Sequence, residues 1–149
     1  MVTFARLQGS EDPEGIANLV FVAVFGQLDR FVGDEDRFVA FTFSIARNKV
    51  IDERRARSRR VVTGPIDGHE AVGGNVEQDA FAGLSDAARR ALAQLTDDQR
   101  EILFLRLIAD LSLEAVAHLT GRSVGATKAM QHRALAAMKK KISEEAVSK

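Results

Sequence analysis

The chain has 149 residues, of which 46% are hydrophobic, and its 21 basic and 21 acidic side chains cancel. This length allows one ordinary domain or two small ones, and the apolar content excludes wholesale disorder. The absence of cysteine excludes disulfides and thiolate chemistry and fits a cytoplasmic location, and no apolar run reaches the ~20 residues needed to insert into a membrane.

The net charge of zero conceals an uneven distribution of charge. Residues 47–60 hold seven bases and two acids, and residues 121–149 hold the same numbers, whereas residues 61–80 hold four acids and no base. Affinity for nucleic acid follows local charge, so the two basic segments indicate two contacts with a polyanion. Solvated helix faces would give the same pattern, and charge alone does not separate the two interpretations.

The first predicted helix runs from Pro13 to about Leu28. Asp12 is suited to cap it, and proline is favoured at the first helical position. Residues 16–25 are apolar almost all round, which predicts burial on more than one face of the helix. Only a short segment precedes Asp12, so the sequence predicts no helix there to cover that surface.

A polar break over residues 29–36 separates this helix from a second one, predicted from about Asp36 to Arg60. Phe38, Phe41 and Ile45 recur at helical spacing and predict its buried stripe, and its C-terminal end is rich in arginine. Residues 61–80 contain four glycines and one proline without periodicity, which is typical of a flexible linker.

The second half of the chain predicts four more helices. Thr96 and Gln99 form a capping box, and Ser112 and Ser123 are suited to cap the last two helices. The expected helices cover residues 77–95, 97–109, 113–119 and 124–142. We therefore predict an all-α fold of two small helical domains, residues 1–60 and 81–149, joined by the linker 61–80.

The last two predicted helices have the layout of a helix-turn-helix. A short helix ends at Gly121, which suits a left-handed turn, and a longer basic helix follows. Ala117 is small enough to let the two helices cross closely. The pattern favours DNA binding, although a purely structural helical hairpin would look similar.

Residues 38–55 (Phe-Val-Ala-Phe-Thr-Phe-Ser-Ile-Ala-Arg-Asn-Lys-Val-Ile-Asp-Glu-Arg-Arg) resemble the promoter-reading helix of the extracytoplasmic-function (ECF) class of bacterial sigma factors. Residues 12–31 look like that family's polymerase-binding helix and the loop after it, and residues 95–102 and 111–135 are similar to its second DNA-binding domain. The resemblance spans about residues 12–142 in the family's order.

The resemblance implies a factor that performs no chemistry and directs core RNA polymerase to promoter DNA. The first domain would read and melt the −10 element through Arg47, Asn48, Arg54, Arg55 and Arg57. The second would bind the −35 element through Arg122, Ser123, Lys128, His132 and Arg133. Core polymerase would bind at Glu14, Asn18 and Phe21, and an anti-sigma factor is a further expected partner.

The sequence also departs from the family pattern. The family's first domain begins with a further helix or two, and we expect the domain over residues 1–60 to be incomplete at its N-terminal end for lack of them. The family's polymerase-binding helix also carries acids and a glutamine where this chain has Gly15, Asn18 and Leu19. Two other functions therefore stay open: a helix-turn-helix DNA-binding regulator that uses residues 81–142 alone, and a truncated decoy that titrates an anti-sigma factor.

An enzyme is the weakest interpretation. His69, His118 and His132 are far apart in the sequence, and no metal-binding, phosphate-binding or triad motif accompanies them. We expect no catalytic residue, no metal and no cofactor.

Overall fold

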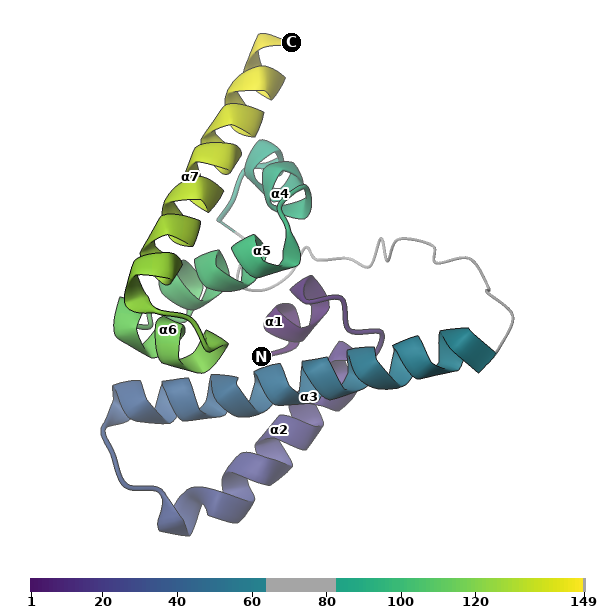
Figure 1. Cartoon of the computed structure of the whole chain (residues 1–149), viewed down its shortest axis with the longest axis vertical. Coiled ribbons are helices and arrows are strands. Elements are labelled where there is room, and N and C mark those ends of the chain that lie inside the picture. Colours follow the sequence, from purple (N-terminus) through teal and green to yellow (C-terminus); the bar gives the residue numbers. More distant parts are fainter. Residues whose placement is uncertain (64–82, 149) are drawn as a thin grey trace.

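The computed structural model describes residues 1–63 and 83–148, and every regular element within them is helical, which confirms the all-α prediction (Figure 1). In chain order the elements are α1 (Val2–Leu7), α2 (Pro13–Gln27), the 3-10 turn η1 (Leu28–Arg30), α3 (Glu35–Thr63), α4 (Asp86–Ala93), α5 (Asp97–Leu103), the π-helical segment η2 (Phe104–Ile108), α6 (Leu113–Thr120) and α7 (Val124–Val147).

Helix α2 begins as the sequence predicts but is less buried than expected. The Asp12 side chain accepts a hydrogen bond from the backbone N–H of Gly15 at 3.0 Å, with Pro13 as the first helical residue. The prediction of burial on more than one face is wrong. Helices α1 and α3 pack against a single stripe of α2, and the remaining surface is exposed, including Phe21 and Phe25.

The sequence predicted no helix before Asp12, and the structure corrects this. Helix α1 is short, yet its Phe4 is completely buried. The Phe4 ring meets Phe43 of α3 and Phe104 of η2, with ring centroids 5.3 Å and 5.5 Å away. Phe43 and Phe104 also contact each other, at 5.9 Å. One side chain of α1 therefore packs against both halves of the chain.

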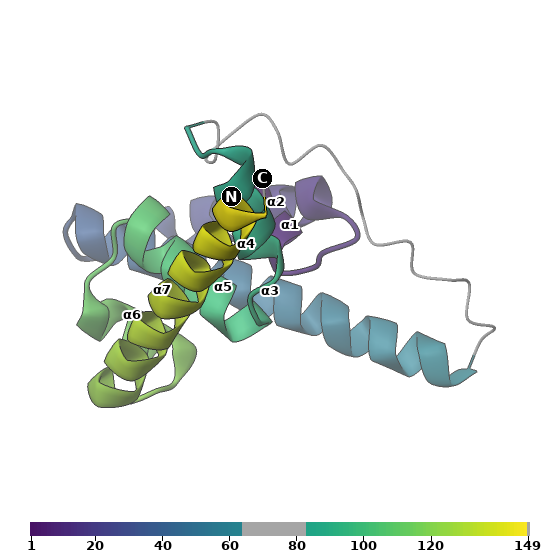
Figure 2. The same cartoon turned by 90° about the horizontal axis from the view of Figure 1, so that it is seen from above.

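Helix α3 is a single helix of 29 residues that runs across the molecule beneath α1 and α6 (Figure 1). The loop before it is tied down by Phe31, whose ring lies 5.4 Å from the rings of Phe38 and Phe41. The C-terminal end of α3 projects beyond the other helices in both views (Figures 1 and 2). The helix continues to Thr63, and residues 64–80 of the predicted linker lie outside the described residues.

The caps predicted for the second half are all present. Thr96 and Gln99 exchange hydrogen bonds of 3.2 Å in a complete capping box. Ser112 and Ser123 each accept a backbone N–H at 3.1 Å. Gly121 ends α6 in the left-handed region, with φ of 70°, where a residue without Cβ avoids strain.

Three predicted boundaries differ from the structure. Of the helix predicted over residues 77–95, the described part is helical only from Asp86, where Ser85 caps α4, to Ala93, and residues 77–82 lie outside the described residues. The helix from Asp97 does not stay α-helical to Ala109, because the Ala109 N–H bonds the Phe104 carbonyl five residues back and forms the π-segment η2. Helix α7 continues past residue 142 to Val147, with Glu145 near its end bonded to Arg90 of α4.

Helix α5 and η2 form the centre of the second half, and together with α6 they contact the first half. The five consecutive residues 101–105 are all buried, so this helix is covered on most of its circumference. Glu101 is among them, and its Oε1 lies 2.7 Å from Nε of Arg47 on α3. Burial raises the pKa of the Glu101 carboxyl above its ordinary value of 4.5, and the charge and hydrogen bond of Arg47 only partly oppose that rise.

This raised pKa makes stability depend on pH in a defined direction. The folded chain binds the Glu101 proton more tightly than the unfolded chain, so the contribution of Glu101 is fully present below 4.5 and is lost as pH rises through the raised value. We expect the free energy of unfolding of wild type, relative to Glu101→Gln, to fall as the pH rises above about 4.5. Urea unfolding of both proteins measures it, and a relative stability that increases with pH would contradict the burial argument.

Candidate nucleic-acid interface

The five side chains predicted for the −10 element all lie on α3, but on different faces of it. Asn48 and Arg55 are exposed and seven residues apart, which places them two turns apart on one face. Arg47 is only 24% exposed, because it is held by Glu101. The helix therefore presents part of the predicted set to solvent and turns part of it toward the second half of the chain.

Arg54 and Arg57 hold the first part of the fold together. Arg54 donates to the backbone carbonyl of Gln8, and its Nη2 lies 3.6 Å from Oδ2 of Asp97 on α5. Arg57 donates to the carbonyl of Gly9 at 2.8 Å and lies 3.2 Å from Oε1 of Glu11. Both arginines thus fasten the connection between α1 and α2 to α3, a structural role that the sequence analysis did not predict.

A shallow hollow of about 400 Å³ lies along α3. Three of its five lining residues are arginines; the set is Ile51, Arg54, Arg55, Ser58 and Arg59. Guanidinium groups around an open hollow can hold a phosphate and leave room for the group attached to it.

Helices α6 and α7 form the predicted helix-turn-helix. Ala117 is buried four residues before Gly121, where the two helices meet. The N–H of Arg122 bonds the Ala117 carbonyl at 2.9 Å, which closes the turn. Helix α7 buries only Thr127 and Ala134 along its length, so most of its first half faces solvent.

The residues predicted for the −35 element fall into two groups. Lys128, His132 and Arg133 are exposed on α7, and the first two share a face because they are four residues apart. Ser123 caps α7 with its hydroxyl oxygen, and Arg122 lies 3.0 Å from Asp98 of α5. Arg122 and Ser123 are therefore each engaged in a contact within the fold, although Ser123 is exposed.

The residues predicted for polymerase binding are exposed on one face of α2. Glu14, Asn18 and Phe21 follow each other at helical spacing. Beside them lie large apolar side chains that remain in solvent, namely Leu19 (53% exposed), Val22 (71%) and Phe25 (69%). An exposed apolar surface of this kind marks an interaction site.

Among the residues that the structure describes, no three or more His, Asp or Glu side chains are grouped so that they could hold a metal ion. No helix over residues 1–63 and 83–148 is both long and apolar enough to cross a membrane.

The sequence analysis missed the acids of α5 as functional groups. Asp97 and Asp98 lie in the first turn of α5, where negative charge is favourable. The structure also places Asp97 and Glu101 against Arg54 and Arg47 of α3. The only signal in the sequence was the four-residue spacing of Asp97 and Glu101, which places them on one face of α5. That spacing does not reveal which helix the face contacts.

Two family profiles match the chain, one in each half. The profile of Sigma-70 region 2 matches residues 2–60, and the profile of Sigma-70 region 4 matches residues 85–138. These segments contain the arginine-rich helix α3 and the helix-turn-helix of α6 and α7 respectively.

The fold is similar to that of a solved structure, the sigma factor RpoE in complex with the anti-sigma factor NepR from Bartonella quintana. The match has a TM-score of 0.69 and 23% identity, and covers 95% of this chain and 89% of the other.

Curated relatives are more similar in sequence. The ECF RNA polymerase sigma factor ShbA of Streptomyces griseus is 33% identical over 132 residues, covering 85% of this chain and 69% of the relative. The ECF RNA polymerase sigma factor SigD of Mycobacterium tuberculosis is also 33% identical, covering 87% of this chain and 62% of the relative. The chain thus spans about two thirds of these relatives. It belongs to the ECF class of bacterial RNA polymerase sigma factors.

Proposed function

We propose that this chain directs core RNA polymerase to specific promoters, with α3 reading and melting the −10 element and α7 binding the −35 element. The observation that carries the proposal is the pair of exposed cationic helices, one in each segment matched by a sigma-factor profile. Two separate DNA contacts on one chain are what a factor needs in order to recognise a promoter at two positions.

Helix α7 is suited to the major groove of double-stranded DNA, which is wide enough to admit an α-helix. Its exposed first half combines small residues with bases: Gly125, Ala126 and Ala129 leave the backbone free to approach closely, and Lys128 and Arg133 supply charge. Most such contacts reach phosphates and position the helix, and fewer reach bases. The free N–H groups at the start of α7 add a site for a phosphate.

Helix α3 is suited to a single strand. Asn48 has an amide that can hydrogen-bond a base edge. Arg55 lies on the same face of α3 and is one of the residues that line the hollow. Cationic grooves that follow the backbone are typical of single-strand binding. On this reading Arg54 and Arg57 act mainly by holding α3 in place, since each is already engaged within the fold.

The exposed face of α2 is suited to bind a protein partner. The relatives are named RNA polymerase sigma factors, so core polymerase is the partner that we propose. Its apolar side chains carry the contact, with Glu14 and Asn18 at the rim. An anti-sigma factor is a second partner for this face, because the sigma factor of similar fold was solved in complex with one. A chain that bound only that partner would act as a decoy.

Transcription in vitro tests the proposal directly. The purified chain with bacterial core polymerase is expected to produce transcripts from a promoter library that share one upstream motif. A folded chain that binds core polymerase without transcription would favour the decoy function. A chain that binds duplex DNA but not polymerase would favour the regulator.

The −10 assignment predicts a defect in strand opening. Asn48→Ala with Arg55→Ala removes one charge and one amide from the exposed face of α3, and is expected to reduce open-complex formation while duplex binding at the −35 element is unchanged. Permanganate footprinting measures the opening. The control is Arg37→Ala, which removes one charge from the same helix about 16 Å from Asn48, toward the N-terminal end of α3. Equal effects of the two variants would refute the assignment.

The −35 assignment predicts a loss of salt-dependent binding. The double variant Lys128→Ala with Arg133→Ala is expected to bind duplex DNA carrying the −35 element with a weaker dependence on salt. The negative slope of log K against log salt concentration should become less steep by about 2, because each phosphate contact contributes about 0.9. Lys139→Ala with Lys140→Ala removes the same charge from the same helix and is the matched control. The assignment fails when both pairs change the slope equally.

A further inference from the structure

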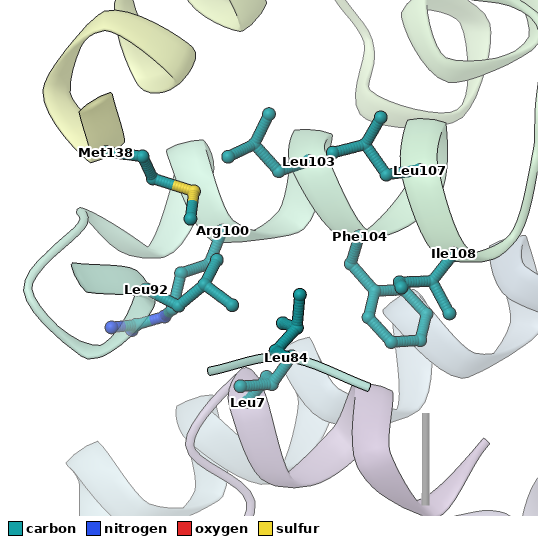
Figure 3. A pocket seen from close by; sticks show the side chains of 9 residues that line it. All are labelled: Leu7, Leu84, Leu92, Arg100, Leu103, Phe104, Leu107, Ile108 and Met138. Carbon is teal, nitrogen blue, oxygen red and sulfur yellow. The ribbon is translucent and has the colours of Figure 1, made fainter. Parts of the chain in front are cut away.

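An apolar cavity of about 130 Å³ lies between α1 and the helices of the second half, apart from the surfaces assigned to DNA and polymerase. Leu7 of α1, Leu92 of α4, Leu103 of α5, Phe104 of η2 and Met138 of α7 are among the side chains that line it (Figure 3). Elements far apart in the sequence therefore build one cavity, and nothing in the proposed function uses it.

The walls of the apolar cavity offer no partner for a polar ligand. The surface that the described residues give it consists of apolar atoms alone. Arg100 belongs to the lining but contributes carbon atoms, because its guanidinium donates to the carbonyls of Ala93 and Leu95 at 3.2 Å and 3.0 Å. A water molecule in a cavity needs about two to four polar partners, and a charged ligand loses its hydration on entry. The walls therefore select a neutral, apolar occupant.

The size of the apolar cavity and the groups in its walls favour a single aromatic ring. Apolar cavities of about 150 Å³ in proteins admit benzene, and this one is only slightly smaller. The ring of Phe104 can pack edge-to-face or offset against a second ring, and the thioether of Met138 is suited to contact an aromatic group. An aliphatic molecule of the same volume would lack both of these contacts.

The π-helical segment η2 supplies both an inner wall and the mouth of the apolar cavity. Phe104 is 5% exposed, whereas Leu107 and Ile108 line the same cavity and are 61% and 39% exposed. The exposed pair marks the side from which a ligand can enter. π-turns are rare in helices and are frequent at functional sites. In this one the Ala109 N–H donates to the Phe104 carbonyl at 3.0 Å, so the unusual turn coincides with the opening of the cavity.

We propose that the apolar cavity is a binding site for a small, neutral aromatic molecule of one ring, which enters beside Leu107. A ring in this position contacts Leu7 of α1 and Met138 of α7 at once and supplies packing that the lining atoms lack without it. The ligand binds the folded chain and not the unfolded chain, so it raises stability. The site goes beyond the proposed function and does not rest on it.

Titration of benzene into the full chain, with the Leu and Met methyl groups labelled with ¹³C, tests the site by NMR. The ring current of bound benzene is expected to shift the methyl signals of Leu7, Leu103 and Met138. The methyl signals of Leu19, which is 53% exposed on α2, are expected to stay in place and report any unspecific binding to apolar surface. Shifts of equal size at Leu19 and at the cavity would overturn the proposal.

Pyrimidine is the matched control ligand, because it has the same ring size as benzene and carries two nitrogen acceptors. It is expected to bind about tenfold more weakly or worse, since its nitrogens give up hydrogen bonds to water and find no donor in the walls. Equal affinities for benzene and pyrimidine would overturn the assignment of an apolar ligand.

Filling the apolar cavity with a larger side chain separates a true site from a general effect of solvent. Leu7→Trp is expected to abolish the methyl shifts, and because the chain contains no tryptophan, its fluorescence also shows whether the indole lies out of water. Leu135→Trp makes the same change on α7 outside the lining and is expected to keep benzene binding. Leu7→Phe is a smaller filling change, expected to weaken binding, for use if circular dichroism shows that Leu7→Trp loses its helices. Unchanged benzene affinity in a folded Leu7 variant would overturn the site.

Unfolding in urea gives an independent measure of the same binding. With benzene at ten times its Kd, the unfolding equilibrium constant of wild type is expected to fall about elevenfold, and that of Leu7→Trp is expected to stay the same. An equal response of the two proteins would contradict binding in the apolar cavity. Failure of the transcription assay, by contrast, would count against the proposed function and leave these results intact.

Discussion

The burial of Phe4 is the contact on which the arrangement of the chain depends. Helix α1 is too short to be stable alone, and its position is set by one ring that lies against Phe43 of α3 and Phe104 of η2. Through this ring the first half meets the second, and α1 in turn covers part of α2. The ion pairs between α3 and α5 are placed around the same contact.

The arginines of α3 show how one helix can serve both folding and binding. Those that point inward meet carboxylates and backbone carbonyls: Arg47 at Glu101, Arg54 at Gln8 and Asp97, and Arg57 at Gly9 and Glu11. Arg55 points outward and is exposed. A count of bases along the helix therefore overstates the charge that the folded chain offers to DNA.

The exposed face of α2 is apolar, in contrast to the arginine-rich surface of α3. Phe21, Val22 and Phe25 remain partly in solvent, although complete burial of a fully exposed side chain of this kind gains about 1.5–3 kcal/mol. Helices α1 and α3 already occupy the other side of α2, and no described element reaches this one. A protein partner that covers the face would recover that free energy, which is why the face supports polymerase binding in the proposed function.

Much of the local structure follows from short-range chemistry and was predictable from the sequence. The caps at Asp12, Thr96, Ser112 and Ser123 and the left-handed turn at Gly121 each depend on residues within about one helical turn. The face shared by the bases of α7 was also predictable, because spacing along a helix decides which residues lie on the same face. The resemblance to ECF sigma factors rested on such local motifs in their order along the chain, and the sequence comparisons confirmed the family.

Contacts between distant segments were not predictable in this way. The helix at residues 2–7 was missed because its stability comes from Phe4 packing on Phe43 and Phe104, and the structural tasks of Arg54 and Arg57 depend on carbonyls more than forty residues away in sequence. By itself the sequence determined the caps and turns that bound most of the helices and which charges each helix carries. Only the tertiary structure decided which of those charges face solvent and which face Glu101 and Asp97, since that choice depends on how apolar faces far apart in the chain come together.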